Sequence, residues 1–203
     1  MSTLEFLFDV GSPNAYFCHK IIPEIESRTG QTFTYVPILL GGIFKATNND
    51  PPMIKFKEVK HKLAYMKREI ERFIERHHLE DYRWNPDFPI NTVKVMRGAI
   101  VADRAGTLRA YADAVFHHIW EDPKKMDDLD VIRSAFEESG FDAEAILTGI
   151  EDQAIKDALR KNTEQAVARG VFGSPTFFVG EEMFFGKETL PLVEEEITRR
   201  NAV

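Results

Sequence analysis

Cysteine is almost absent from this sequence: Cys18 is the single one among 203 residues. One thiol cannot close an internal disulfide, and thiol–disulfide exchange needs both an attacking and a resolving sulfur. The sequence therefore excludes a disulfide-stabilised fold and a dithiol oxidoreductase, and it favours a reducing compartment. We expect Cys18 itself to pack in the core.

Long apolar runs are also lacking. No segment approaches the roughly 18 apolar residues that span a bilayer, and no basic stretch followed by an apolar one opens the sequence, as in a signal peptide. These absences predict a cytoplasmic protein without membrane contact. The net charge of −7 and the lack of interleaved basic and aromatic residues argue against nucleic acid as a partner.

Several catalytic and metal-binding signatures are missing as well. The sequence has no glycine-rich phosphate loop and no Gly-x-Ser-x-Gly elbow. Histidine occurs in two adjacent pairs, His77-His78 and His117-His118, and neighbours in sequence point to different sides of a helix. We therefore predict no metal site.

What the sequence does contain is a strand–helix–strand unit at its start and a strand–strand–helix unit at its end. Between them, apolar residues recur at helical spacing, as in the stripe formed by Val59, Leu63, Met66, Ile70 and Phe73. The expected strands cover 3–9, 32–38, 176–179 and 183–185. The expected helices cover 13–28, 91–105, 108–119, 129–139, 142–150, 155–166 and 190–199, and a loop is expected over 39–52.

Strands at both ends of the chain imply one sheet built from the terminal segments. A strand–helix–strand unit of this length gives two parallel strands with a right-handed crossover, and Gly180-Glu181-Glu182 predicts a hairpin. We therefore predict an α/β fold in two parts. Residues 1–52 and 170–203 form a discontinuous sheet domain, and residues 53–169 form a large all-helical insertion.

The segment Gly11-Ser12-Pro13 joins the first strand to the first helix. Ser12 is suited to cap that helix and Pro13 to occupy its first position. The Ser12 hydroxyl then lies at the positive end of a helix dipole, where an anion is stabilised; the alternative is that Ser12 serves only as the cap. Asp9, at the end of the strand, either caps and pairs locally or acts as a base.

Three motifs together resemble the DsbA-type thioredoxin family. They are residues 9–13, where oxidoreductase members carry Cys-x-x-Cys, residues 40–45 with 49–52, and residues 170–176, which resemble the segment holding the cis-proline of this fold. Serine in place of the first cysteine resembles the 2-hydroxychromene-2-carboxylate isomerases and the kappa-class glutathione transferases. The resemblance implies a thioredoxin-like fold (βαβ…ββα), a cis bond before Pro175, and a cytoplasmic, dimeric enzyme of aromatic catabolism.

The same resemblance implies a binding site for glutathione. Family members often read Gly-x-Asp-Arg where this chain has Glu188-Thr189, which is a departure from the pattern. The alternative for Lys62 is that it lies on a solvated helix face and binds no ligand. The alternative for the three residues assigned below to a co-substrate is that their roles are structural. The implied residues are Ser12 as the catalytic group beside the sulfur; Asn49, Lys62, Ser174, Pro175, Lys187 and Glu188 as further contacts of glutathione; and Lys45, Trp84 and Asn91 as contacts of an acidic aromatic co-substrate.

A serine hydroxyl at the start of a helix can supply enough free energy to lower the pKa of a bound thiol. Lowering the pKa of a thiol from about 8.5 by two units requires about 2.7 kcal/mol. A hydrogen bond to the anionic sulfur supplies roughly 1.5–3 kcal/mol, and the helix end adds up to about 1 kcal/mol. The resemblance thus implies a glutathione-dependent cis/trans isomerase of a conjugated aromatic enone acid. The alternatives are a kappa-like glutathione S-transferase acting on a small electrophile and a catalytically silent thioredoxin-like binding module.

Overall fold

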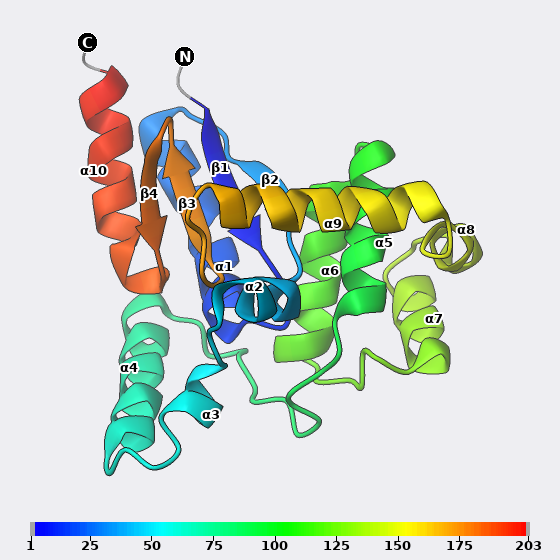
Figure 1. Cartoon of the computed structure of the whole chain (residues 1–203), viewed down its shortest axis with the longest axis horizontal. Coiled ribbons are helices and arrows are strands. Elements are labelled where there is room, and N and C mark those ends of the chain that lie inside the picture. The colour runs from blue at the N-terminus through cyan, green and yellow to red at the C-terminus, as the bar shows by residue number, and fades with distance from the viewer. Residues whose placement is uncertain (1–2, 202–203) are drawn as a thin grey trace.

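The computed structural model describes residues 3–201. Residues 1–2 and 202–203, which the predicted domain bounds include, lie outside the described residues. In chain order the helices and strands (Figure 1) are β1 (Leu4–Phe8), α1 (Pro13–Thr29), β2 (Thr34–Pro37), α2 (Leu40–Thr47), α3 (Pro52–Lys55), α4 (Lys62–His77), α5 (Val93–Arg104), α6 (Leu108–Trp120), α7 (Leu129–Glu138), α8 (Ala143–Gly149), α9 (Gln153–Ala168), β3 (Thr176–Val179), β4 (Glu182–Phe185) and α10 (Leu190–Asn201). A short 3₁₀ helix, η1 (Lys187–Thr189), precedes α10.

The four strands form one mixed sheet in the order β2-β1-β3-β4. β1 runs parallel to β2, with Phe6 opposite Tyr35, and antiparallel to β3, with Phe6 opposite Phe177. β3 and β4 form the expected hairpin. The prediction of an α/β, thioredoxin-like fold with a large helical insertion is confirmed.

The alternation of side chains along β1 explains why helices cover both faces of the sheet. Successive side chains of a strand point to opposite faces. Phe6 and Phe8 belong to the main core, which α1 and α10 help to build. Leu7 points the other way, into a second cluster with Ile43 of α2 and Ala166 of α9. Both faces of β1 are therefore buried, and its last residues lead directly to the start of α1 (Figure 1).

The loop predicted over residues 39–52 is wrong: Leu40–Thr47 form helix α2. Gly41 and Gly42 suggested a loop, but Ile43 is fully buried under the sheet and tertiary packing outweighs the cost of glycine in a helix. The helix ends at Asn48, which adopts a left-handed conformation with φ 51°. This helix brings Asn49 to the segment that follows α9, where its side chain contacts the Phe172 carbonyl.

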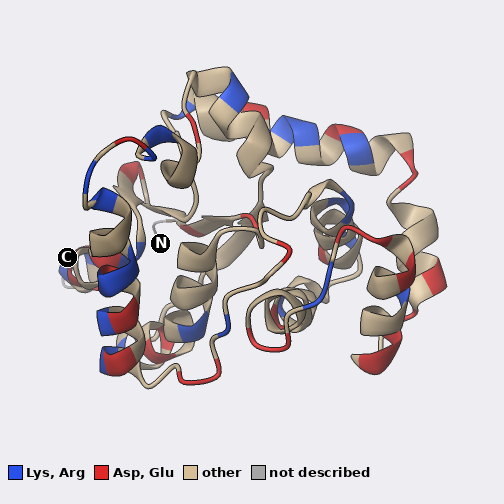
Figure 2. Cartoon of the chain, turned by 90° about the horizontal axis from the view of Figure 1, so that it is seen from below, with Lys and Arg blue, Asp and Glu red and all other residues tan. Residues whose placement is uncertain are grey.

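A second departure concerns the region after α2. The stripe that begins at Val59 predicts a helix from that residue, whereas α4 begins at Lys62 and Val59 is 50% exposed. Along α4 only Phe73 is buried, and charges of both signs follow its surface (Figure 2). We call α3, α4 and the turn between them, residues 52–77, the α3–α4 arm. Figure 1 shows this arm below the sheet, in contact with the rest mainly at one end.

The division into a sheet domain and a helical insertion stays a proposal. Helix α9, which lies within the predicted insertion, packs against α2 and β2. One buried cluster also joins residues of β1 and α1 with residues of α5, α6 and α7. Among residues 3–201 no helix combines the length and the apolar character needed to cross a membrane. Cys18 is buried in the core, as expected.

Candidate active site

Three residues from two distant segments of the chain form a closed ring of hydrogen bonds at the start of α1. The Ser12 hydroxyl donates to the carbonyl oxygen of Ser174 at 2.9 Å, and the Ser174 hydroxyl accepts from the Asp9 N–H at 3.1 Å. The Ser12 N–H closes the ring by donating to the Asp9 carbonyl at 3.0 Å. Ser12 and Ser174 are therefore brought together, and each holds the other in place.

Ser12 also caps α1, as the sequence predicts. Its Oγ accepts from the Ala15 N–H at 3.2 Å, and Pro13 occupies the first turn. Ser12 is 5% exposed, and its hydroxyl lies where the first N–H groups of the helix point outward. Within residues 3–201 the Asn14 N–H donates to no acceptor, and the buried Asn14 Oδ1 has no donor. An anion beside Ser12 would find unused donors and the positive end of the helix dipole.

The Ser174–Pro175 peptide bond is cis, which confirms the expectation for this segment. The Pro175 carbonyl accepts from the Gly186 N–H at 3.0 Å, so the turn after β4 lies beside the cis-proline. In the part of the chain that the structure describes, the Ser174 N–H donates to no acceptor. This free N–H next to Ser12 is suited to pair with the backbone of an extended peptide. A second cis bond, Phe88–Pro89, was not expected from the sequence.

Asn49 and the turn after β4 complete one side of the site. The Asn49 side-chain amide donates to the Phe172 carbonyl at 3.1 Å, which ties the end of α2 to the cis-proline segment. Lys187 is 6% exposed and its ammonium lies 5.3 Å from the centre of the Phe73 ring. It is paired with the exposed Glu188 carboxylate. The Glu188 carboxylate, predicted as a contact of glutathione, thus already has a cationic partner.

The predicted co-substrate residues are not joined to Ser12 by any direct contact within residues 3–201. Lys45 is exposed on α2. Asn91 accepts from the Val93 N–H at 3.1 Å and so supports the start of α5. Trp84 is 46% exposed and packs on Trp120 at a ring-centre distance of 6.0 Å. Their part in substrate binding stays a prediction.

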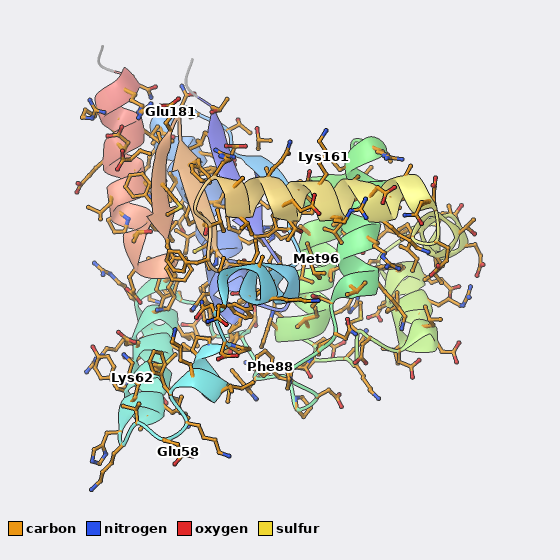
Figure 3. All side chains as sticks on the ribbon, in the orientation of Figure 1. Glu58, Lys62, Phe88, Met96, Lys161 and Glu181 are labelled. Carbon is orange, nitrogen blue, oxygen red and sulfur yellow. The ribbon has the colours of Figure 1, made fainter. Side chains whose placement is uncertain are left out.

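Lys62 lies on the α3–α4 arm, away from the ring around Ser12. Figure 3 labels it at the start of α4, beside α3. Its ammonium is 5.4 Å from the centre of the Phe56 ring and 5.9 Å from that of Tyr65. Both aromatic partners belong to the arm itself. Within residues 3–201 the Lys62 ammonium forms no salt bridge, while Glu71 and Glu75 on the same helix pair with Arg68.

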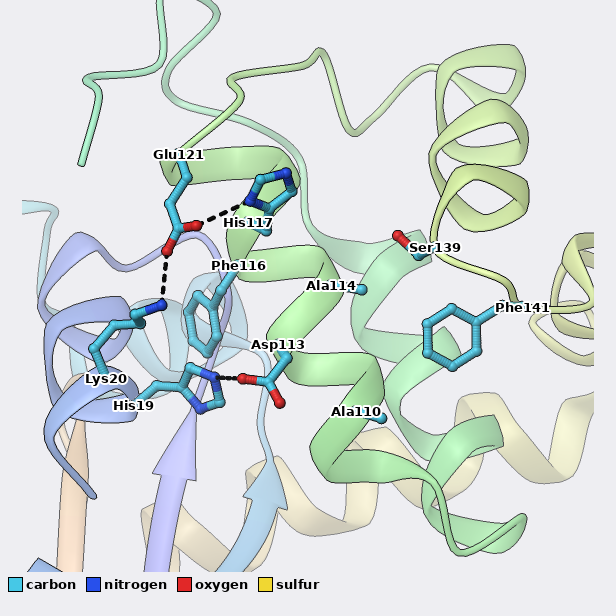
Figure 4. A pocket seen from close by; sticks show the side chains of 10 residues that line it. All are labelled: His19, Lys20, Ala110, Asp113, Ala114, Phe116, His117, Glu121, Ser139 and Phe141. Atoms are coloured by element: carbon cyan, nitrogen blue, oxygen red, sulfur yellow. Dashed lines mark hydrogen bonds and ion pairs between the residues drawn. The ribbon is translucent and has the colours of Figure 1, made fainter. Parts of the chain in front are cut away.

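A cavity of about 410 Å³ lies between α1 and α6, but it includes none of the predicted site residues (Figure 4). Glu121 on its wall accepts from the Tyr16 hydroxyl at 2.9 Å and pairs with Lys20 at 3.0 Å and with His117 at 2.9 Å. Burial alone would raise the pKa of Glu121, but these three donors lower it to about 2. The charge on this wall is therefore satisfied within the protein.

The buried polar side chain on the opposite wall of this cavity also has its hydrogen-bond partners within the protein. His19 is buried and its two ring nitrogens contact the Tyr35 hydroxyl at 2.8 Å and Asp113 at 2.7 Å. A histidine with both nitrogens engaged has no free position for a ligand. Neither Glu121 nor His19 therefore offers a free group to a ligand in this cavity. The ring around Ser12 remains the candidate active site.

The adjacent histidines do not diverge as the sequence suggested. Ligand atoms of His117, His118 and Asp122 all lie within 4.8 Å of one another. A cation already contacts this group: the Lys124 ammonium lies 3.1 Å from His118 Nδ1 and 3.2 Å from Asp122. Burial and then Lys124 lower the pKa of His118. We base no metal proposal on this cluster because the lysine takes the place next to two of its ligand atoms.

Sequence reasoning missed two residues that hold the site. The Trp120 indole N–H donates to the Val10 carbonyl at 2.8 Å, and the Val10 N–H contacts Met96 Sδ at 3.5 Å. Both partners come from helices far along the chain, and no local pattern around them signals the contact. Thr92 directly precedes α5, and its hydroxyl donates to the Asp9 carboxylate at 3.1 Å.

Comparisons with known proteins agree with this geometry. A family model, the DSBA-like thioredoxin domain, matches residues 3–198. The chain is 29% identical to 2-hydroxychromene-2-carboxylate isomerase of Sphingobium xenophagum, covering 95% of this chain and 96% of that protein. It is 26% identical to glutathione S-transferase kappa 1 of Rattus norvegicus, covering 94% of this chain and 88% of that protein.

The fold is shared with a solved structure as well. The chain matches the structure of a 2-hydroxychromene-2-carboxylate isomerase with a TM-score of 0.85 at 25% identity, over 98% of both chains. The resemblance that the motifs at residues 9–13, 40–52 and 170–176 indicate is confirmed. With its four-stranded sheet, its cis-proline beside the start of α1 and a family match over nearly its whole length, the chain belongs to the family of DSBA-like thioredoxin domains.

Proposed function

We propose that the chain is a glutathione-dependent cis/trans isomerase of a conjugated aromatic enone acid, of the 2-hydroxychromene-2-carboxylate type. The observation that carries the proposal is the Ser12 hydroxyl, buried at the start of α1 and directed at the carbonyl oxygen beside the cis-proline. Position 15 is Ala15 and Cys18 is buried, so the protein supplies no thiol of its own at this place.

The residues around Ser12 fit a peptide-like thiol. The free Ser174 N–H and the unpaired Asn14 N–H are donors without acceptors in residues 3–201. When bound, glutathione supplies a thiolate that adds reversibly to a conjugated double bond, permits rotation about it, and leaves unchanged. Ser12 stabilises the negative sulfur by donating its hydroxyl hydrogen, and the start of α1 favours the charge.

The existing bond from Ser12 to Ser174 sets the energetic balance. To donate to a sulfur, the Ser12 hydroxyl must leave the Ser174 carbonyl, which costs about 1 kcal/mol of hydrogen bonding. The carbonyl is then free to accept an N–H from the peptide backbone of the ligand, and the Ser174 N–H pairs in the other direction. Ligand binding therefore exchanges one internal bond for a charge-assisted bond and a backbone pair.

The other contacts of glutathione follow the family pattern and remain part of the proposal. Asn49 lies at the cis-proline segment, and Lys187 and Glu188 follow Gly186, which touches Pro175. Lys62 would contribute its charge to a carboxylate of glutathione. A cytoplasmic location and a homodimer belong to the same proposal, as do the co-substrate roles of Lys45, Trp84 and Asn91.

Ser12→Ala tests the proposal. The exchange removes the donor to sulfur and the side-chain cap of α1, so turnover with glutathione should fall at least about tenfold, while the fold should stay intact at a cost of about 1 kcal/mol in the free energy of unfolding. Calorimetric titration with glutathione should still show binding, because the backbone donors remain. Unchanged turnover in Ser12→Ala would contradict the role of the hydroxyl, and failure of the wild-type protein to bind glutathione would contradict the whole proposal.

Kappa-like conjugation is the second candidate, and the similarity to glutathione S-transferase kappa 1 favours it. Both reactions start from the same stabilised thiolate, so the site alone does not separate them. Isomerisation returns glutathione, whereas conjugation consumes one molecule per turnover. Measuring free thiol during conversion of an unsaturated aromatic acid and of a halogenated aromatic electrophile distinguishes the two. A silent binding module would convert neither compound, and glutathione would not protect it against thermal unfolding.

A further inference from the structure

We propose that Asp9 is the positioning residue that holds the Ser12 hydroxyl in place for the bound thiol. The proposal rests on the proposed function, since it concerns the same thiol. Asp9 is 1% exposed and is not among the residues that line the cavity of Figure 4, so we assign it no direct contact with substrate.

The carboxylate of Asp9 fastens three separate segments to the end of β1. Its Oδ1 accepts from the Gly11 N–H at 2.9 Å, and its Oδ2 accepts from the Leu40 N–H at 2.8 Å and from the Thr92 hydroxyl at 3.1 Å. Leu40 is the first residue of α2, and Thr92 is the cap of α5. The side chain therefore joins the turn at residues 9–12 to the starts of two helices.

The hydrogen bonds to the Asp9 carboxyl oppose the effect of its burial. Burial raises the pKa of this carboxyl above its ordinary value, and the N–H groups of Leu40 and Gly11 and the Thr92 hydroxyl offset part of that rise. A carboxylate only accepts hydrogen bonds, and all three neighbours donate, so an amide at this position would set two donors against each other. The starts of α2 and α5 add the positive ends of two helix dipoles.

The position of Ser12 depends on this side chain through the turn. Gly11 directly precedes Ser12 and is held by Oδ1, while the backbone of Asp9 makes two of the three bonds in the ring with Ser12 and Ser174. The fit around Gly11 is close as well. A Cβ there would lie 2.8 Å from Thr92 Cγ2 and 3.3 Å from Asp9 Oδ1. A shift of the carboxylate therefore moves the turn and the hydroxyl together.

Two substitutions test the proposal, each made with and without Ser12→Ala. Thr92→Val removes one donor and keeps the charge of Asp9, and Asp9→Asn removes the charge and one acceptor. The measurement is the pKa of the thiol of bound glutathione, from the ultraviolet absorbance of the thiolate at saturating glutathione. Thr29→Val is the matched control, because its hydroxyl donates to Ile25 at 2.7 Å at the far end of α1.

A positioning role predicts effects that require Ser12. Thr92→Val should raise the thiol pKa by about half a unit when Ser12 is present and leave it unchanged in Ser12→Ala. Asp9→Asn removes a nearby negative charge, which lowers the thiol pKa in both backgrounds. Loss of positioning raises the thiol pKa only when Ser12 is present. The change in thiol pKa caused by Asp9→Asn should therefore be about one unit more positive with Ser12 than in Ser12→Ala. Thr29→Val should match the wild type.

Equal shifts in the two backgrounds would overturn the positioning role while the proposed function stands. Absence of glutathione binding in the wild-type protein would overturn both, and calorimetry separates that case at the start. If Asp9→Asn fails to fold, the Thr92→Val pair decides, because it keeps the carboxylate and two of its donors. A wild-type thiol pKa in folded Thr92→Val would then count against the proposal.

Discussion

The ring around Ser12 and the α3–α4 arm belong to one proposed site, yet they are held in opposite ways. Ser12 is 5% exposed, and its ring of hydrogen bonds links β1, the start of α1 and the segment before β3. The arm carries Lys62 and contributes one buried side chain, Phe73, to the core. Figure 3 shows the contrast: Met96, whose Sδ contacts the Val10 N–H, lies inside the fold, and Lys62 lies on the arm outside it.

The contrast follows from what each group is proposed to do. A hydrogen bond to sulfur depends steeply on distance and angle, so its donor must be fixed by several partners. The attraction between an ammonium and a carboxylate falls off slowly with distance in water. A lysine on a loosely attached helix is sufficient for it. We infer that the fold fixes the chemical group and leaves the binding charge adaptable.

Trp120→Phe would break the rigid side of this comparison and should have the largest effect. The substitution removes the donor to the buried Val10 carbonyl, two residues before Ser12. An unsatisfied buried carbonyl and the lost ring volume together cost about 3 kcal/mol in the free energy of unfolding. Denaturant unfolding measures the loss. Trp84→Phe is the control, since Trp84 is 46% exposed and should lose less than about 0.5 kcal/mol. Equal losses in the two variants would refute the account.

Phe73→Ala would test whether the arm opens on its own. Phe73 is 6% exposed, with its ring 5.5 Å from that of Phe17 and beneath the Lys187 ammonium. Its removal should free α4 and lower the global free energy of unfolding by only about 1 kcal/mol, because the arm detaches before the core unfolds. Hydrogen exchange should accelerate in α4 and stay slow in α1. The exposed Ile54 gives the control, Ile54→Ala, which should exchange like the wild type. Uniform acceleration across both helices would contradict local opening.

The same contrast explains what the sequence could predict. Ser12, Pro13 and Gly30 act within a few residues of themselves, so the bounds of α1 and its cap follow from local rules, and the structure confirms them. The alternation of β1 and the hairpin at residues 180–182 are local in the same sense. The cis bond before Pro175 was different: only the resemblance of residues 170–176 to the cis-proline segment of the family indicated it, and no physical rule did.

Contacts between distant segments could not be predicted in this way. The Trp120 bond to Val10 and the convergence on Asp9 depend on how α5 and α6 pack, which no window of sequence contains. The helix at Leu40–Thr47 was missed because its two glycines indicate a loop, while burial of Ile43 and the Asp9 carboxylate at its start favour a helix. The contacts from which we propose a joint role of Ser12 and Asp9 therefore became visible only in three dimensions.

Lys62→Ala should have the smallest effect and would sharpen the adaptable side of the comparison. An exposed ion pair to a ligand contributes about 0.2–1 kcal/mol, so the affinity for glutathione should fall about threefold while turnover at saturation stays unchanged. Because such attraction is screened, the difference from wild type should shrink as salt is added. Lys67→Ala removes the same charge from another side of α4 and is the control. A loss of turnover in Lys62→Ala would show that the arm takes part in the chemistry. If Lys62→Ala and Lys67→Ala bind glutathione with equal affinity, the loss comes from the change in net charge, and Lys62 does not contact glutathione.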